Sequence, residues 1–118
     1  MPDDEREPNW NFPQYEGPLH EVFPQLHAAQ NAWMAQLDSL KAPDRKTHEL
    51  IRMAVTVGLR NPLGVERHAM LAREVGATWE EILGSIMLTV PGHGLLPAAQ
   101  AIPAARRGFE AARETEQE

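Results

Sequence analysis

The positions of proline, glycine and capping residues divide this sequence into segments of helical periodicity and leave no run typical of a β-strand. Pro62 follows an apolar run over residues 50–59 and can begin a helix, because its fixed φ suits the first helical turn. Gly76 is placed to end that helix as its C-terminal cap. Thr78 and Glu81 have the spacing of a capping box, which predicts a further helix directly after Thr78. The sequence therefore predicts an all-α fold.

Five or six helices are expected in one compact domain, residues 18–118, preceded by an extended arm over residues 1–17 that is rich in proline and acids. The first helix should run from Pro18 to about residue 37, although Pro24 interrupts its first turns. Its expected inward face is Val22, Leu26, Ala29, Trp33 and Leu37.

The remaining segments complete the predicted fold. The apolar run over residues 50–59 is expected to form the buried central helix. The helix after Thr78 should continue to about residue 90, and Pro91-Gly92-His93-Gly94 is expected to be a loop. A last helix is predicted from Pro97 to about residue 114, bent at Pro103.

Composition excludes several classes of function. The chain has 118 residues, no cysteine and a net charge of -6. Without sulfur nucleophiles it has no disulfide, thiolate metal site or thiol redox centre. An acidic chain with no basic stripe has no electrostatic reason to bind nucleic acid, and no apolar run approaches the length of a membrane helix. Because the first residues are acidic rather than those of a signal peptide, a cytoplasmic location is expected.

Three ionisable residues are candidates for chemistry. Glu49 lies at the start of the apolar helix and shares a face with Met53. It is either a partly buried carboxylate or a first-turn acid whose charge interacts favourably with the helix dipole. His68 is expected to point inward from an apolar face, as hydrogen-bonded core histidines commonly do. His93 lies between glycines, where a ring contributes little to packing and can meet a ligand. The other histidines, His20, His27 and His48, are expected at the surface.

The segment from Leu40 to Ala101, about half of the chain, carries a recognisable series of residues. These are Asp44-Arg45-Lys46-Thr47-His48-Glu49-Leu50-Ile51, then His68, Ala72, Gly76-Ala77-Thr78, Glu80-Glu81-Ile82, Gly94 and Pro97-Ala98-Ala99. The series resembles the carboxymuconolactone decarboxylase family within the alkylhydroperoxidase D-like superfamily. The resemblance implies a helical domain of that type that assembles as a homo-oligomer, commonly a trimer or hexamer.

The resemblance also places the candidate residues. In the superfamily's peroxidase branch, a Glu and a His serve two cysteines as a proton relay. Glu49 and His68 occupy those two positions, whereas Asn61 and Gly64 fall where the cysteines would be. The decarboxylase branch, which lacks the redox pair, is the nearer comparison. It differs from this chain in usually having a polar or acidic residue at the position of Gly64 and often an aromatic residue at that of His93.

The resemblance therefore implies a cofactor-independent lyase or isomerase that acts on a small carboxylated or lactone-like molecule, as in the catabolism of aromatic compounds. Glu49, His68 and His93 are the expected catalytic residues in one pocket, with the histidines as proton carriers. Substrate binding is expected at Arg60, Asn61 and Arg67. Two alternatives stay open: a zinc or iron site formed by the three catalytic candidates, and a non-catalytic binding or scaffold protein.

Overall fold

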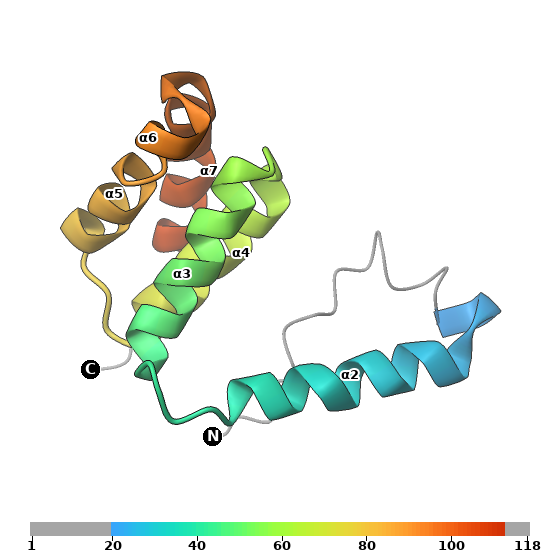
Figure 1. Cartoon of the computed structure of the whole chain (residues 1–118). Helices are drawn as coiled ribbons and strands as arrows, with labels where there is room; N and C mark the ends of the chain where they lie inside the picture. Colours follow the sequence, from blue (N-terminus) through green and yellow to red (C-terminus); the bar gives the residue numbers. More distant parts are fainter. Residues whose placement is uncertain (1–19, 113–118) are drawn as a thin grey trace. The chain divides into compact units, whose positions relative to one another are not determined.

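The computed structural model describes residues 20–112, and all regular secondary structure in that range is helical (Figure 1). The helices are α2 (Pro24–Asp38), α3 (Arg45–Gly58), α4 (Pro62–Glu74), α5 (Trp79–Met87), α6 (Val90–His93) and α7 (Leu95–Ala111). The all-α prediction is confirmed. The predicted arm, residues 1–17, lies outside the described residues. No helix of the described part of the chain is long and apolar enough to cross a membrane.

The chain divides into two compact units between Lys41 and Ala42, so the first helix belongs to a unit of its own. Within that unit, Phe23 has a non-helical backbone and α2 begins at Pro24, which confirms that this proline interrupts the predicted helix. None of the residues of α2 is buried. The face that was expected to turn inward is therefore exposed, as at Leu26 (60%) and Trp33 (62%).

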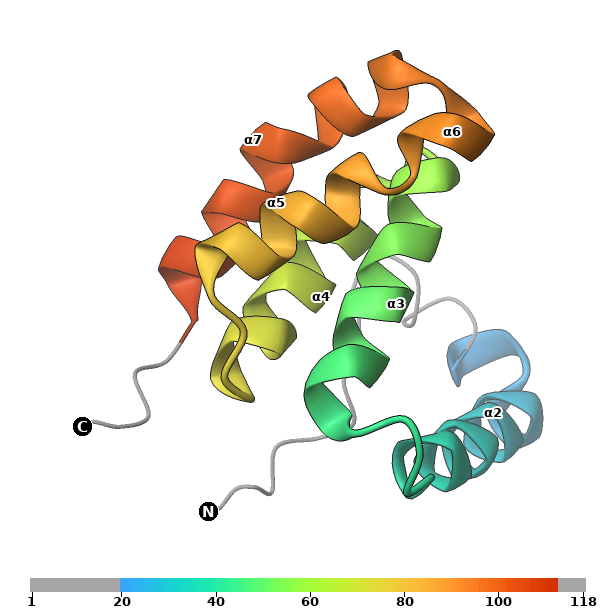
Figure 2. The same cartoon turned by 60° about the vertical axis from the view of Figure 1, so that its left-hand side comes forward.

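The second unit holds the apolar core, which α3, α4, α5 and α7 build together. Figure 2 shows α5 alongside α7, and α4 packs more extensively on α7 than on any other helix. Gly108 permits this close approach, because a Cβ there would collide with the backbone carbonyl oxygen of Glu66. The largest fully buried apolar side chains of the core are Met53, Val57, Val65, Ile82 and Ile86.

Helix α3 is buried on one face only, which corrects the prediction for the central apolar run. Its buried residues are His48, Glu49, Met53 and Val57, whereas Ile51, Val55 and Leu59 are at least half exposed. The expected surface position of His48 is therefore wrong. Apolar residues fill more than one face of this run, so its composition alone did not show which face would meet the core.

The glycine-rich segment after α5 also differs from its prediction. Residues 91–93 form the end of the short helix α6, because Pro91 suits a first helical turn and Gly94, at φ 90°, ends the helix. His93 is thus the last residue of a helix and not a loop residue. Helix α7 then begins at Leu95 and passes through Pro103 to Ala111, close to the predicted limits.

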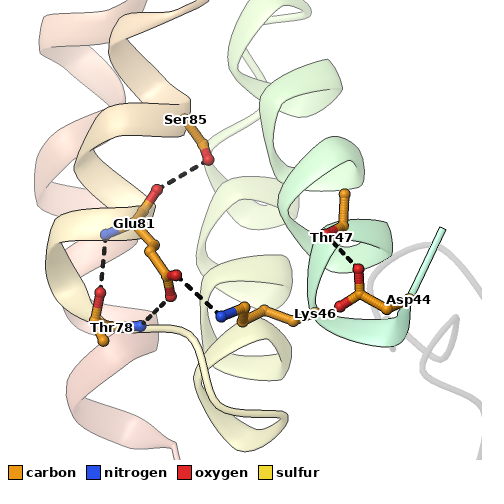
Figure 3. Close-up of polar contacts among 6 residues, drawn as sticks. All are labelled: Asp44, Lys46, Thr47, Thr78, Glu81 and Ser85. Atoms are coloured by element: carbon orange, nitrogen blue, oxygen red, sulfur yellow. Dashed lines mark hydrogen bonds and ion pairs between the residues drawn. The ribbon is translucent and has the colours of Figure 1, made fainter.

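The starts of α3 and α5 are tied together by polar contacts (Figure 3). The capping box is confirmed: the Glu81 amide donates to Thr78 Oγ1 at 3.0 Å, and the Thr78 amide donates to Glu81 Oε1 at 2.9 Å. The other carboxylate oxygen of Glu81 accepts a hydrogen bond from Lys46 Nζ at 2.9 Å. This bridge positions the first turn of α3, on which Glu49 follows Lys46 by three residues.

Candidate functional site

Glu49 and His68 form a buried carboxylate–imidazole pair between α3 and α4. His68 Nδ1 lies 3.0 Å from Glu49 Oε1, and the side chains are 8% and 0% exposed, respectively. Both residues lie on the inward faces of their helices, and the two faces meet because α3 and α4 pack directly against each other. The structure thus brings together two of the three predicted catalytic residues.

Arg45 approaches the second oxygen of the same carboxylate from one turn earlier on α3. Its Nη2 lies 3.0 Å from Glu49 Oε2, and the arginine side chain is 39% exposed. Arg45 and Glu49 have the distance of an ion pair but not the angles of a hydrogen bond, because Glu49 Oε2 accepts no hydrogen bond among the described residues. Glu49 therefore has one hydrogen-bond partner, His68, and a second partner, Arg45, that interacts with it mainly through charge.

The pKa of Glu49 reflects competing influences. Burial is the largest single influence and raises this pKa, because a carboxylate loses its hydration inside the protein. The hydrogen bond and charge of His68, followed by the charges of Arg45 and Arg52, together outweigh burial and bring the pKa below its usual value. Glu49 is therefore ionised at neutral pH, and this state favours a hydrogen bond donated by His68.

An ionised carboxylate can only accept, so His68 donates its Nδ1 proton to Glu49. This contact orients the ring and turns the opposite nitrogen, Nε2, away from Glu49. A carboxylate that holds an imidazole in this way also stabilises its positive charge after it takes up a proton. The pair has the chemistry of a general acid or base.

A pocket of about 250 Å³ lies between the end of α3, the start of α4 and the first half of α7. Its lining residues are Thr56, Val57, Arg60, Asn61, Pro62, Val65, Pro97, Gln100 and Ala101. Arg60 is the only charged residue in this lining, and the remainder is mostly apolar. Two of the three predicted substrate-binding residues, Arg60 and Asn61, therefore line a pocket.

The local backbone explains the position of both residues. Arg60 has φ 56°, an uncommon left-handed conformation for a residue with a side chain, at the turn that joins α3 to α4. Asn61 caps α4, because its Oδ1 accepts a hydrogen bond from the Gly64 amide at 3.1 Å. A side chain at Gly64 would begin 2.6 Å from Thr56 Cγ2, so this packing requires glycine at that position.

Neither residue of the carboxylate–imidazole pair lines this pocket. Val65 lines the pocket, and His68 follows it by one turn of α4, about 4.5 Å along the helix axis. On α3, Val57 lines the pocket, and Met53 lies between it and Glu49 on the same buried face. Along the two helices, the pocket lining is thus nearer to His68 than to Glu49.

His93 lies elsewhere, so the expectation that three catalytic residues share one pocket is not met. Its exposed ring packs over Gly58, where Nε2 lies 2.7 Å from the position that a Cβ would occupy. Gly58 follows Glu49 by nine residues, about 13 Å along the axis of α3. The periodicity of separate segments did not indicate this separation, because it depends on how α6 packs against α3.

Two further expectations concern Arg67 and a metal site. Arg67 is half-buried on α4 and is not part of the pocket lining. Among the described residues, no group of three or more histidine or acidic side chains is placed to hold a metal ion, so Glu49, His68 and His93 do not form the alternative zinc or iron site.

Sequence reasoning missed two polar side chains in the pocket, Thr56 and Gln100. Thr56 shares a helix face with Glu49, and this spacing was a signal for it. Gln100 belongs to an alanine-rich helix far along the chain and had no such signal. Comparisons of the chain with protein-family models, with curated proteins and with solved structures find no match.

Proposed function

We propose that this chain is a cofactor-independent lyase or isomerase that acts on a small carboxylated or lactone-like molecule. The observation that carries the proposal is the buried Glu49–His68 pair, at 3.0 Å, in which His68 follows Val65 of the pocket lining by one turn of α4. The pocket lining has a single cationic side chain, Arg60. The proposal includes a carboxymuconolactone decarboxylase-like family and fold type and a trimeric or hexameric assembly, which the sequence resemblance implies. It also includes a cytoplasmic location, which the acidic first residues favour.

The pocket limits the substrate to a small molecule. Its volume of about 250 Å³ is below the range of roughly 300–1,000 Å³ typical of sites for drug-sized ligands. One ring with a short acidic substituent is of suitable size. Arg60 would hold a substrate carboxylate by paired hydrogen bonds, since its guanidinium makes no ion pair or hydrogen bond among the described residues. Asn61 and Gln100 would offer amide groups to the ring oxygens.

In the proposed lyase reaction, the bond between a ring carbon and its carboxylate breaks and carbon dioxide leaves. The electron pair passes into the conjugated lactone carbonyl as an enolate, and the His68 imidazolium then gives its Nε2 proton to carbon. An isomerase would use the same imidazole to take a proton from one carbon and return it to another. In both cases Glu49 holds the ring and stabilises its charged form.

The test uses a carboxylated muconolactone and related unsaturated lactone acids with the purified full chain. Carbon dioxide release and deuterium uptake from D₂O are followed by NMR. His68→Gln should lower kcat by about 100-fold or more, the usual contribution of a general acid or base. His20→Gln, in the first unit, is the matched control and should retain full turnover. The proposal fails if the His68 variant turns over normally, or if no lactone acid reacts or exchanges.

A non-catalytic ligand-binding protein is the second candidate. It is favoured by one observation: the pocket lining includes neither Glu49 nor His68. A protein of this class would bind lactone acids in calorimetry without turnover. Arg60→Gln would then lower the affinity, whereas His68→Gln would leave it unchanged.

A further inference from the structure

The polar side chains in the lining of the pocket between α3, α4 and α7 are Thr56, Arg60, Asn61 and Gln100. A mostly apolar pocket gains its specificity from a few polar groups of this kind. What each of them can offer to a ligand depends on which of its atoms are already used in hydrogen bonds within the protein. The internal hydrogen bonds of Thr56 and Asn61 therefore restrict the chemistry of the ligand.

Thr56 can act only as an acceptor toward a ligand. Its hydroxyl donates its single proton to the Met53 carbonyl oxygen, at an Oγ1–O distance of 2.7 Å. A hydroxyl has one proton and two lone pairs, so only the lone pairs of Oγ1 are left. The methyl group of Thr56 lies against Gly64, where a Cβ would come within 2.6 Å of Thr56 Cγ2. The hydrogen bond and the methyl contact together hold the side chain in this arrangement.

The turn between α3 and α4 has the opposite character. Asn61 Oδ1 accepts the Gly64 amide at 3.1 Å, so the part of this side chain without a partner among the described residues is the amide nitrogen, Nδ2, with two protons. Arg60 has only donors, and its positive charge is the only charge in the pocket lining. This turn therefore offers N–H donors and a positive charge.

The backbone at Arg60 supports a role for its side chain in binding. Its φ of 56° lies in the left-handed region, where glycine is favoured and a side chain is disfavoured. Residues held in such conformations cluster at binding and active sites. An arginine at this strained position, in the lining of a pocket, is therefore a candidate for a ligand contact.

We propose that the pocket binds a small cyclic carboxylic acid that also carries a hydroxyl group. The carboxylate pairs with Arg60 and with Asn61 Nδ2, the ring lies against the apolar part of the lining, and the hydroxyl donates to Thr56 Oγ1. Gln100 has both a donor and an acceptor and can bind either group. The inference rests on the part of the proposed function that makes this pocket the substrate site, and it narrows the substrate to acids with a hydrogen-bond donor.

The experiment compares benzoate with 3-hydroxybenzoate and 4-hydroxybenzoate, which share the ring and the carboxylate and differ in the hydroxyl. Calorimetric titration of the full chain at pH 7 measures each affinity. At least one hydroxybenzoate should bind about 5-fold or more tightly than benzoate, the effect of one hydrogen bond. Thr56→Val removes the acceptor with little change of shape and should abolish this preference, whereas Thr56→Ser keeps the hydroxyl and should retain it.

Two further variants complete the design. Thr89→Val is the matched control, because Thr89 Oγ1 donates to the Ile86 carbonyl oxygen at 2.7 Å in the same way but lies outside the pocket lining. It should leave the preference unchanged. Asn61→Asp keeps an oxygen to cap α4 but replaces the donor by a negative charge, so it should weaken the binding of every carboxylate by about 10-fold or more. Circular dichroism establishes that each variant is folded.

Equal affinities for benzoate and both hydroxybenzoates would overturn the inference, as would the absence of any carboxylate binding. A preference that survives in Thr56→Val, or binding that Asn61→Asp leaves unchanged, would also overturn it. None of these measurements needs turnover. Hydroxybenzoates that bind as expected to a chain that reacts with no lactone acid would therefore support this inference and refute the proposed function, and turnover without a hydroxyl preference would do the reverse.

Discussion

Removal of the His68 imidazole should leave a buried carboxylate without its only directed partner. Glu49 is fully buried, and in His68→Ala its Oε1 loses the 3.0 Å hydrogen bond. Arg45 stays close to Oε2, but it is 39% exposed and solvent screens its charge. An unsatisfied buried polar group costs about 1–3 kcal/mol, so we expect His68→Ala to lower the free energy of unfolding by about that amount at pH 7.

A second substitution separates the unpaired charge from the loss of packing. Glu49→Gln in the His68→Ala background replaces the carboxylate by a neutral amide, which is less costly to bury without a cationic partner. The double variant should therefore be more stable than His68→Ala alone, by about 1 kcal/mol. Leu71→Ala on the same helix is the control: it removes a buried side chain of the core, and Glu49→Gln should not rescue it.

Urea unfolding followed by circular dichroism at 222 nm measures all these variants. The reasoning is refuted if the double variant is less stable than His68→Ala, because the cost would then come from packing alone. It is equally refuted if Glu49→Gln raises the stability of Leu71→Ala by the same amount.

Two further predictions concern pH and glycine. Because the pKa of Glu49 is below its usual 4.5 in the folded state, its charge stabilises the fold above that pH, and this contribution is lost as the pH falls through lower values. Glu49→Gln should therefore lower the free energy of unfolding by about 1–2 kcal/mol at pH 7 and by progressively less below pH 4.5. Urea unfolding of both proteins at a series of pH values measures this difference, and a difference that does not change with pH would contradict the prediction. In Gly108→Ala the new Cβ would meet the Glu66 carbonyl oxygen, so this substitution should destabilise the fold by about 1–3 kcal/mol. Gly84 has open space around it, so Gly84→Ala should stabilise the fold by up to about 1 kcal/mol. Equal melting temperatures for these two variants would contradict the close packing of α4 on α7.

Local signals in the sequence determined where most of the helices begin and end. Thr78 and Glu81 placed the start of α5, and Pro62 and Gly76 placed both ends of α4. Such signals act within a few residues, through capping hydrogen bonds and through the restricted φ of proline, so they can be read without the fold. The inward direction of His68 was also readable, because its spacing places it on the same face of α4 as Val65, Leu71 and Ala72.

Only the tertiary structure decided which of these residues meet. Glu49 and His68 come together because α3 and α4 pack directly, whereas His93 is carried by α6 to Gly58, near the other end of α3. The outer face of α3 is as apolar as its inner face, so periodicity could not show that His48 would be buried and Val55 exposed. Helix periodicity records which residues share a face, but the partner of that face is set by packing between segments far apart in the chain.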